Sequence, residues 1–249
     1  MKLNHMEKLP GEGATEYALR TLRSNILHLS LEPGERISVA EISQEMNISR
    51  TPVQNAFTRL SEEAMLKIIP QSGTYVSMID MKRVYESVCL RNLMDQTVLY
   101  RLCESGITPK ELYMLKANLN EQDFYSSQGD FIKSLALDTQ FHQLFYQLCH
   151  MDSIYNAMQT IAADQCRVRM LKLMCKLRNK TTEQEHLEML EAIKNRDVAQ
   201  SHAIASRHLE GFAVDLESVH AQYSSYFSNW EQYGPEKFLF RSEEFRNLI

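Results

Sequence analysis

Apolar residues recur at helical spacing along most of this chain, and the first such stretch runs from 15 to 29. Ser38 and Glu41 then form a capping box, in which each side chain binds the other's free backbone N–H, for a short helix over 39–46. Ser49 offers a cap for another helix that begins at about residue 50. Two short helices joined by a tight turn predict a helix-turn-helix.

The pattern changes from helical to extended after this second short helix. An apolar run at 66–69 precedes the turn sequence at 70–73, and 74–77 follows, so we expect a small hairpin with a glycine in its turn. A helix, a helix-turn-helix and a hairpin in this order describe a winged helix. We expect no other β-structure in the chain.

Residues from Asp80 onward show only helical spacing. Residues suited to helix caps are Asp80, Thr108, Asp130, Ser153 and Asp197. The expected helices cover about 81–104, 109–127, 131–149, 153–177, a stretch ending near 195, and 197–223. The predicted fold class is therefore mainly α, with an N-terminal winged helix-turn-helix that carries a small β-hairpin wing and an all-α helical bundle behind it.

These patterns divide the chain into four segments. Residues 1–13 are polar and contain two glycines and a proline, so we expect a disordered lead-in. The winged helix covers 14–78 and the helical bundle 79–222. The last segment, 223–249, is rich in aromatic residues, which disordered tails normally lack. We therefore expect it to pack, either on its own domain or on a partner subunit.

Composition narrows the class of protein. The chain of 249 residues has no apolar run of the roughly 20 residues that span a bilayer and no signal peptide, so we expect a cytoplasmic protein without a membrane partner. Its five cysteines are scattered without a C-x-x-C pair, which favours reduced thiols over disulfides or a zinc knuckle. The net charge of −5 argues against non-specific coating of nucleic acid but allows a local DNA site.

The helix after Ser49 has two different faces. Its apolar residues share one face, and its other face is polar, with Arg50, Gln54, Asn55 and Thr58. Because guanidinium and amide groups bind base edges through paired hydrogen bonds, we interpret this helix as a DNA recognition helix. The alternative is an ordinary amphipathic surface helix.

Three motifs stand in order within about residues 15–77: Pro33-Gly34-Glu35-Arg36-Ile37, Ser49-Arg50-Thr51-Pro52-Val53 and Pro70-x-x-Gly73-Thr74-x-Val76. They resemble the DNA-binding domain of the GntR family of bacterial transcription regulators. This resemblance implies that the chain binds a double-stranded DNA operator. The DNA contacts that we expect are Arg23, Arg36, Ser49, Arg50, Thr51, Gln54, Asn55, Thr58, Arg59, Gln71, Ser72, Gly73 and Thr74.

Two positions depart from the pattern of this family. Gln54 stands where the family usually has an arginine, which should move the base preference from guanine toward adenine. Glu63-Ala64-Met65 stands where the family usually has Glu-Gly-Leu. Since the helix lacks its terminal glycine, we expect it to run slightly longer.

A second candidate site begins with Asp138 and His142. Their i, i+4 spacing places a carboxylate and an imidazole side by side on one helix face, where they can share a divalent metal, although most such pairs are plain surface contacts. Together with His186 after Glu185, and with His208 eleven residues after Asp197, they resemble the FCD ligand-sensing domain of FadR-type GntR regulators over about 81–215. The resemblance implies a metal site formed by Asp138, His142, His186 and His208. Zinc is the first choice of metal, with nickel, manganese and iron as alternatives.

The same resemblance implies that a small organic acid binds at the metal through its carboxylate. Arg91 resembles an arginine near the start of the family's domain, and it can clamp a carboxylate or pair with Asp95. Arg167 and Arg169 are further candidates for binding this effector. His202 should face solvent, because it lies roughly opposite to His208 on the same helix.

These inferences combine into a homodimeric transcription regulator, in which the acid changes the spacing of two winged helices and so the operator affinity. One alternative is a metal-dependent hydrolase that activates water with the Asp/His cluster. Another is a metal that only braces the helices. The sequence does not decide the effector, the operator, the metal or the sign of regulation.

Overall fold

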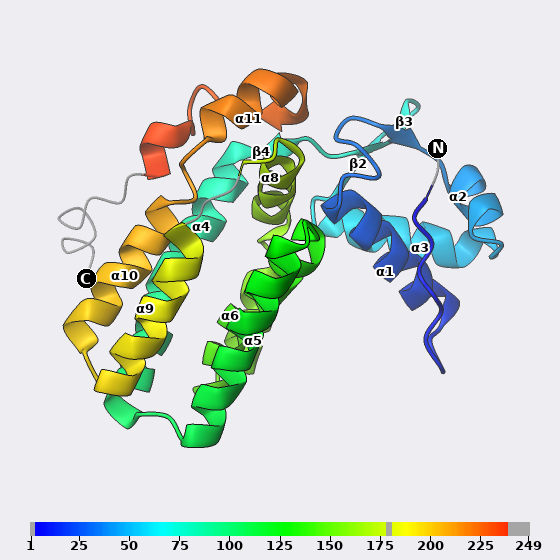
Figure 1. Cartoon of the computed structure of the whole chain (residues 1–249). Helices are drawn as coiled ribbons and strands as arrows, with labels where there is room; N and C mark the ends of the chain where they lie inside the picture. Colours follow the sequence, from blue (N-terminus) through cyan, green and yellow to red (C-terminus); the bar gives the residue numbers. More distant parts are fainter. Residues whose placement is uncertain (1–2, 178–180, 239–249) are drawn as a thin grey trace.

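The N-terminal part of the chain folds as the expected winged helix. In the computed structural model, which describes residues 3–177 and 181–238, three helices lie against one small sheet (Figure 1). The sheet is antiparallel with the order β1-β3-β2, and β2 and β3 form the predicted hairpin. These elements are α1 (Ala14–Leu27), β1 (Arg36–Ile37), α2 (Val39–Glu45), α3 (Arg50–Glu62), β2 (Leu66–Ile69) and β3 (Gly73–Val76). We did not expect β1, because two residues are too short to show an alternating pattern.

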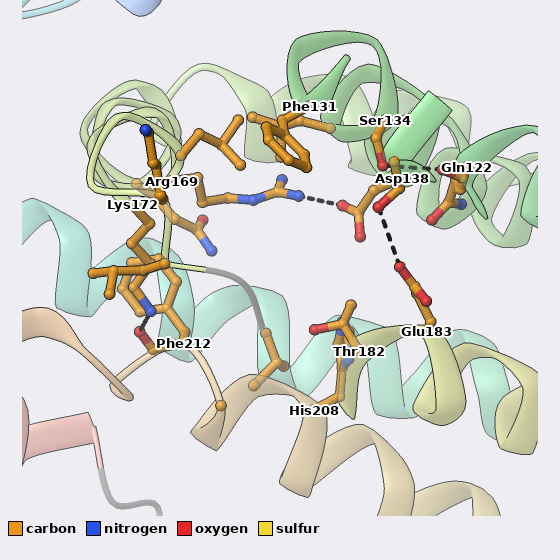
Figure 2. A pocket seen from close by; sticks show the side chains of 18 of the residues that line it. Gln122, Phe131, Ser134, Asp138, Arg169, Lys172, Thr182, Glu183, His208 and Phe212 are labelled. Atoms are coloured by element: carbon orange, nitrogen blue, oxygen red, sulfur yellow. Dashed lines mark hydrogen bonds and ion pairs between the residues drawn. The ribbon is translucent and has the colours of Figure 1, made fainter. Parts of the chain in front are cut away.

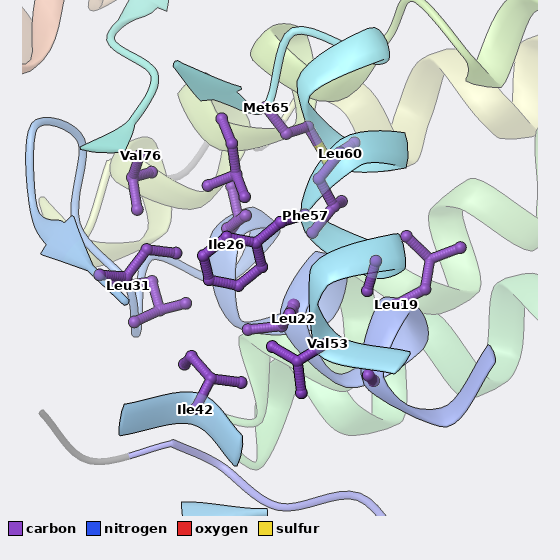
Figure 3. Close-up of a cluster of buried hydrophobic side chains, with 14 of the residues drawn as sticks. Leu19, Leu22, Ile26, Leu31, Ile42, Val53, Phe57, Leu60, Met65 and Val76 are labelled. Carbon is purple, nitrogen blue, oxygen red and sulfur yellow. The ribbon is translucent and has the colours of Figure 1, made fainter. Parts of the chain in front are cut away.

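The apolar face of α3 closes the core of the winged helix (Figure 3). Val53, Phe57 and Leu60 are buried in one cluster with Leu22 of α1 and Ile42 of α2. Fully burying a side chain of this size contributes roughly 1.5–3 kcal/mol. Because this face is fixed in the core, the polar face of α3 is turned to solvent.

The ends of these helices agree only in part with expectation. Ser38 caps α2 as predicted, since its Oγ accepts a hydrogen bond of 3.2 Å from the N–H of Glu41. Ser49 lies at the N-cap of α3, but its side chain makes no capping bond. The expected extension of α3 is wrong: the helix ends at Glu62, and Ala64 adopts the left-handed conformation, with φ of 57°, that glycine usually provides.

The lead-in is not the disordered segment that we expected, as far as residues 3–13 are described. Leu3 is buried in the core of the winged helix. Asn4 and Asn25 exchange hydrogen bonds of 2.8 and 3.0 Å, and the side chain of Arg20 on α1 binds Glu12. Buried Asn25 needs polar partners, and the lead-in supplies them.

The C-terminal part of the chain is the predicted helical bundle around a long central helix, α4. α4 packs against α6, α8, α9 and α10, while α5 pairs with α6 (Figure 1). Among the described residues, no helix is long and apolar enough to cross a membrane. The elements are β4 (Ile79–Asp80), α4 (Met81–Ser105), α5 (Pro109–Ser127), α6 (Phe131–Leu148), α7 (Asp152–Gln159), α8 (Ala163–Met174), α9 (Thr181–Asn195), α10 (Val198–Glu210) and α11 (Leu216–Tyr223).

Two of the predicted helices are each broken into two. The stretch 153–177 divides into α7 and α8, because N–H groups at 160–162 bond three residues back and tighten the chain into turns. The stretch 197–223 divides into α10 and α11, since Asp215 adopts a left-handed φ of 68°. Ser153 is not a helix cap, because α7 already begins at Asp152.

The break before α8 places this helix between the two domains. α8 contacts α1 of the winged helix, and it also packs against α4 (Figure 1). Arg167 on α8 is fully buried and donates to the carbonyl oxygens of Ser77 and Met78 at 2.6 and 3.0 Å. Asp164 pairs with Arg167 and accepts from the N–H of Asp80 at 3.2 Å. We call residues 77–80 the link, and α8 holds it with these two side chains.

The aromatic segment packs on its own chain as far as residue 238. β5 (Phe227–Ser228) pairs in parallel with β4, which corrects our expectation that the wing is the sole β-structure. The short helix η1 (Ser224–Tyr226) directly precedes β5, and η2 (Pro235–Phe238) ends the described chain. Tyr226 donates to Glu32 of the winged helix at 2.6 Å, and Asn229 donates to Asp80 at 2.8 Å. Two further aromatic residues of this segment, Phe240 and Phe245, lie outside the described residues.

Candidate functional site

The solvent face of α3 has the composition that the sequence predicted. Arg50, Thr51, Gln54, Asn55 and Thr58 are all exposed. Thr58 donates its hydroxyl hydrogen to the carbonyl oxygen of Gln54 at 3.1 Å, so this hydroxyl is partly occupied by its own helix. The amide and guanidinium groups of the other exposed residues are turned outward, as base recognition in a major groove requires.

Two of the predicted DNA contacts are occupied by ion pairs within the winged helix. Arg23 pairs with Glu63 at 2.5 Å, and Arg59 pairs with Glu16 at 2.5 Å. Both arginines remain partly exposed. Their guanidinium groups are therefore oriented by carboxylates before any DNA is present.

The wing is shaped around Gly73. This residue has a φ of 132°, and a Cβ added to it would lie 2.9 Å from Nε of Arg36. The Arg36 side chain thus lies against the glycine, which leaves its guanidinium at the surface of the wing. Gln71 and Ser72 at the tip are exposed, and Thr74 is half-buried.

Three of the four predicted metal ligands converge in the helical domain. His142 of α6, His186 of α9 and His208 of α10 each offer a ring nitrogen, and these atoms lie within 4.8 Å of one another. His142 and His186 are buried, whereas His202 is exposed as predicted. We call these three residues the histidine cluster.

The histidine cluster fits a metal ion by its chemistry. Both ring nitrogens of His142 and of His186 are buried without a hydrogen-bond partner among the described residues. Such nitrogens lose their hydration without compensation, and a metal ion that takes the free lone pair of each neutral ring reduces this cost. Burial, reinforced by neighbouring positive charges, lowers the pKa of His186 to about 3 and holds the pKa of His142 well below its usual value. Both imidazoles are therefore neutral, which is the form that binds metals.

Carboxylates lie behind two of the rings of the histidine cluster. Nδ1 of His208 lies 2.9 Å from Oε2 of Glu185 and donates to it, which leaves the Nε2 lone pair free for the cluster. Asp95 lies 3.6 Å from Nδ1 of His142 and accepts a hydrogen bond of 2.7 Å from Tyr146. The sequence did not reveal the role of Tyr146, because nothing in its spacing relates it to the histidines.

Asp138, the fourth predicted ligand, lies at the edge of the histidine cluster. Its Oδ1 is 3.6 Å from Nε2 of His186, while its Oδ2 pairs with Arg169 (Figure 2). Burial acts to raise the pKa of Asp138, but the charges of Arg169 and Arg91 outweigh it and hold the pKa below the usual range. Asp138 is thus an ionised carboxylate that faces the cluster and a guanidinium at once.

A cavity of about 490 Å³ opens beside the histidine cluster (Figure 2). Asp138, His208 and two of the three predicted effector-binding arginines, Arg91 and Arg169, line it. Arg91 also binds Asp95 through its Nε at 3.1 Å, so the predicted ion pair is present and the arginine still lines the cavity. Arg167 does not line the cavity, because its guanidinium is turned to the link. Its assignment as an effector contact is therefore wrong.

Comparisons with known proteins agree with this architecture. Residues 15–76 match the family of bacterial regulatory proteins called the gntR family, and residues 86–211 match the FCD domain. The chain is 28% identical over 219 residues, which are 88% of this chain and 96% of the relative, to the HTH-type transcriptional repressor RspR of Escherichia coli. It is 24% identical over 180 residues, or 72% of this chain and 82% of the relative, to the Nta operon transcriptional regulator of Aminobacter aminovorans.

Solved structures show the same fold. E. coli McbR/YncC superposes with a TM-score of 0.69 at 17% identity and covers 85% of this chain and 99% of its own. A GntR regulator from Rhodococcus sp. RHA1 superposes with a TM-score of 0.65 at 18% identity and covers 86% and 99%. With both domains matched in order, the chain belongs to the GntR family of bacterial transcription regulators and carries an FCD domain behind its DNA-binding domain.

Proposed function

We propose that this regulator is a cytoplasmic homodimeric repressor whose affinity for its operator changes when a small organic acid binds beside a divalent metal ion in the FCD domain. The observation that carries the proposal is the histidine cluster, with its unpartnered buried nitrogens, at one end of a large cavity. The sign of regulation follows the relative RspR, which is named a repressor.

The residues that would hold the metal are the histidine cluster and Asp138. Zinc remains our first choice, with nickel, manganese or iron as alternatives, because imidazole and carboxylate ligands suit all of them. When bound, such an ion provides a Lewis acid for the carboxylate of the organic acid. Arg169 is placed to donate to the same carboxylate, because it lines the cavity and already binds a carboxylate there.

α8 is the element that connects the cavity with the DNA-binding domain. Gln165, Arg169 and Lys172 line the cavity from α8, and Asp164 and Arg167 on the same helix hold the link. A shift of α8 on binding of the acid would therefore move the link and the winged helix behind it. In a homodimer, this movement changes the spacing of the two recognition helices.

DNA binding is tested by a mobility shift with the DNA upstream of the gene. Arg50→Ala should weaken the complex at least tenfold, while Arg101→Ala, which alters an exposed arginine on α4, should leave it unchanged. Equal affinity of the two variants would contradict our assignment of the DNA face.

Metal binding is tested by elemental analysis of the purified protein. His208→Ala should lose the metal, whereas His202→Ala, which alters an exposed histidine on the same helix, should keep it. Equal metal content in the two variants would contradict our assignment of the metal ligands.

The hydrolase alternative has no support from the comparisons, because the matched domains and the named relatives are regulators. A carboxylic ester that is hydrolysed by the wild-type protein but not by His142→Ala would revive this alternative.

A further inference from the structure

The cavity beside the histidine cluster has two chemically different ends. Arg91, Asp138, Arg169 and His208 form a polar end. Most of the lining surface is nevertheless apolar, from side chains that include Leu135 of α6, Leu173 of α8, Leu177 and Phe212, and neutral polar side chains such as Gln122, Ser134 and Gln165 interrupt it. An organic acid that satisfies only the polar end leaves this apolar lining in contact with water.

The size of the cavity exceeds what a small acid needs. At roughly 30 Å³ for each water-sized group, its volume of about 490 Å³ has room for roughly sixteen such groups. A carboxylate group fills only a small part of this space. The remaining space adjoins the apolar lining, so a ligand that fills it gains most by being apolar itself.

The charges in the lining match one carboxylate rather than several. Arg91 is paired with Asp95 and Arg169 with Asp138. Lys172 donates to the carbonyl oxygens of Phe212 and Val214 at 2.6 and 2.5 Å, and it is therefore already bound within the protein.

Two further lining residues also favour a ligand with a single carboxylate. Glu183 adds a negative charge to the lining, which disfavours a second carboxylate, and Lys176 is exposed, where water competes for its ammonium group. Gln122, Ser134 and Gln165 can bind some hydroxyl groups of a sugar acid, but the others would lose their water against the leucines.

We infer that the effector is a monocarboxylic acid with an apolar aliphatic or aromatic body, rather than a short hydroxy acid, a sugar acid or a dicarboxylic acid. This inference rests on the proposed function only in taking this cavity as the effector site. The carboxylate lies at the polar end, and the body lies along Leu135, Leu173 and Phe212.

The test is a binding series on the full-length protein loaded with Zn²⁺, measured by calorimetry. Straight-chain acids from acetate to decanoate should bind about fourfold more tightly for each added CH₂ until the cavity is filled. Gluconate and adipate should bind more weakly than hexanoate, which has the same number of carbon atoms. Affinity that does not change along the series, or tighter binding of gluconate or adipate, would overturn the inference.

Two variants locate the apolar body in the cavity. Leu173→Asn should weaken octanoate at least tenfold and leave acetate unchanged, whereas Leu187→Asn, an exposed position on α9, should change neither. Ser134→Met fills part of the cavity without altering its charges and should also weaken octanoate selectively. If octanoate binds both Leu173→Asn and Ser134→Met as tightly as it binds the wild type, the site lies elsewhere.

A parallel mobility-shift assay separates this inference from the proposed function. If octanoate binds but leaves operator affinity unchanged, the ligand class stands and the proposed control of DNA binding fails. If gluconate changes operator affinity while octanoate does not bind, the proposed control stands and the ligand class is overturned.

Discussion

Replacing Arg167 with methionine removes a buried guanidinium and keeps most of the side-chain volume. In the folded protein this group pairs with Asp164 and donates to two carbonyl oxygens of the link at 2.6 and 3.0 Å. Without it, the partners left to buried Asp164 among the described residues are the N–H of Asp80 and the guanidinium of Arg83, at 3.2 and 3.3 Å. Breaking a buried ion pair costs about 3–5 kcal/mol, so we expect Arg167→Met to lower the free energy of unfolding by this amount.

The loss is measured by urea denaturation followed by circular dichroism. The exposed control Arg101→Met should stay within about 0.5 kcal/mol of the wild type. The double variant Arg167→Met/Asp164→Leu should recover part of the loss, because it also removes the buried carboxylate that has lost its main partner. A loss below about 1 kcal/mol in Arg167→Met, or no recovery in the double variant, would refute the reasoning that α8 holds the link through this pair.

Three further predictions concern the DNA face, the metal and pH. Gln54→Arg should move operator preference from adenine toward guanine, as measured by selection of binding sites from random DNA. An unchanged preference would contradict the assignment of Gln54 as a base contact. Removal of metal with EDTA should lower the melting temperature, and re-addition of Zn²⁺ should restore it, unless the histidine cluster binds no metal. Burial lowers the pKa of Lys172 to about 8, below its value of 10.5 in the unfolded chain, so the unfolded state binds more protons between these values. Stability should therefore rise from pH 8 to pH 10 more in the wild type than in Lys172→Met, in urea titrations at both pH values.

The sequence predicted those features that depend on local spacing. The buried face of α3 follows from Val53, Phe57 and Leu60 at helical intervals. Ser38 caps α2 as predicted, but Glu41 binds the hydroxyl group of Ser38 and not its backbone N–H. The histidine cluster came from resemblance, since the spacing of Asp138 and His142 by itself is common. Its convergence in space could be confirmed only once three helices were placed.

Features that depend on distant contacts were missed. No glycine or proline marks the break between α7 and α8, and the contact of α8 with α1 joins segments that are distant in the sequence. Arg167 and Arg169 are two residues apart, so they lie on nearly opposite sides of α8, and only the position of that helix shows which one faces the cavity. The pairing of β5 with β4 joins residues almost 150 positions apart, and no local pattern encodes it.

The aromatic segment after α11 lies beyond both matched domains, yet it binds the winged helix through Tyr226 and the link through Asn229. In the proposed homodimer, this attachment limits how far each DNA-binding domain can rotate relative to its own FCD domain. Inserting one base pair between operator half-sites rotates one half-site by about 35° around the DNA axis. DNA-binding domains that are held in this way cannot follow that rotation. The operators should therefore have a nearly constant spacing between their half-sites.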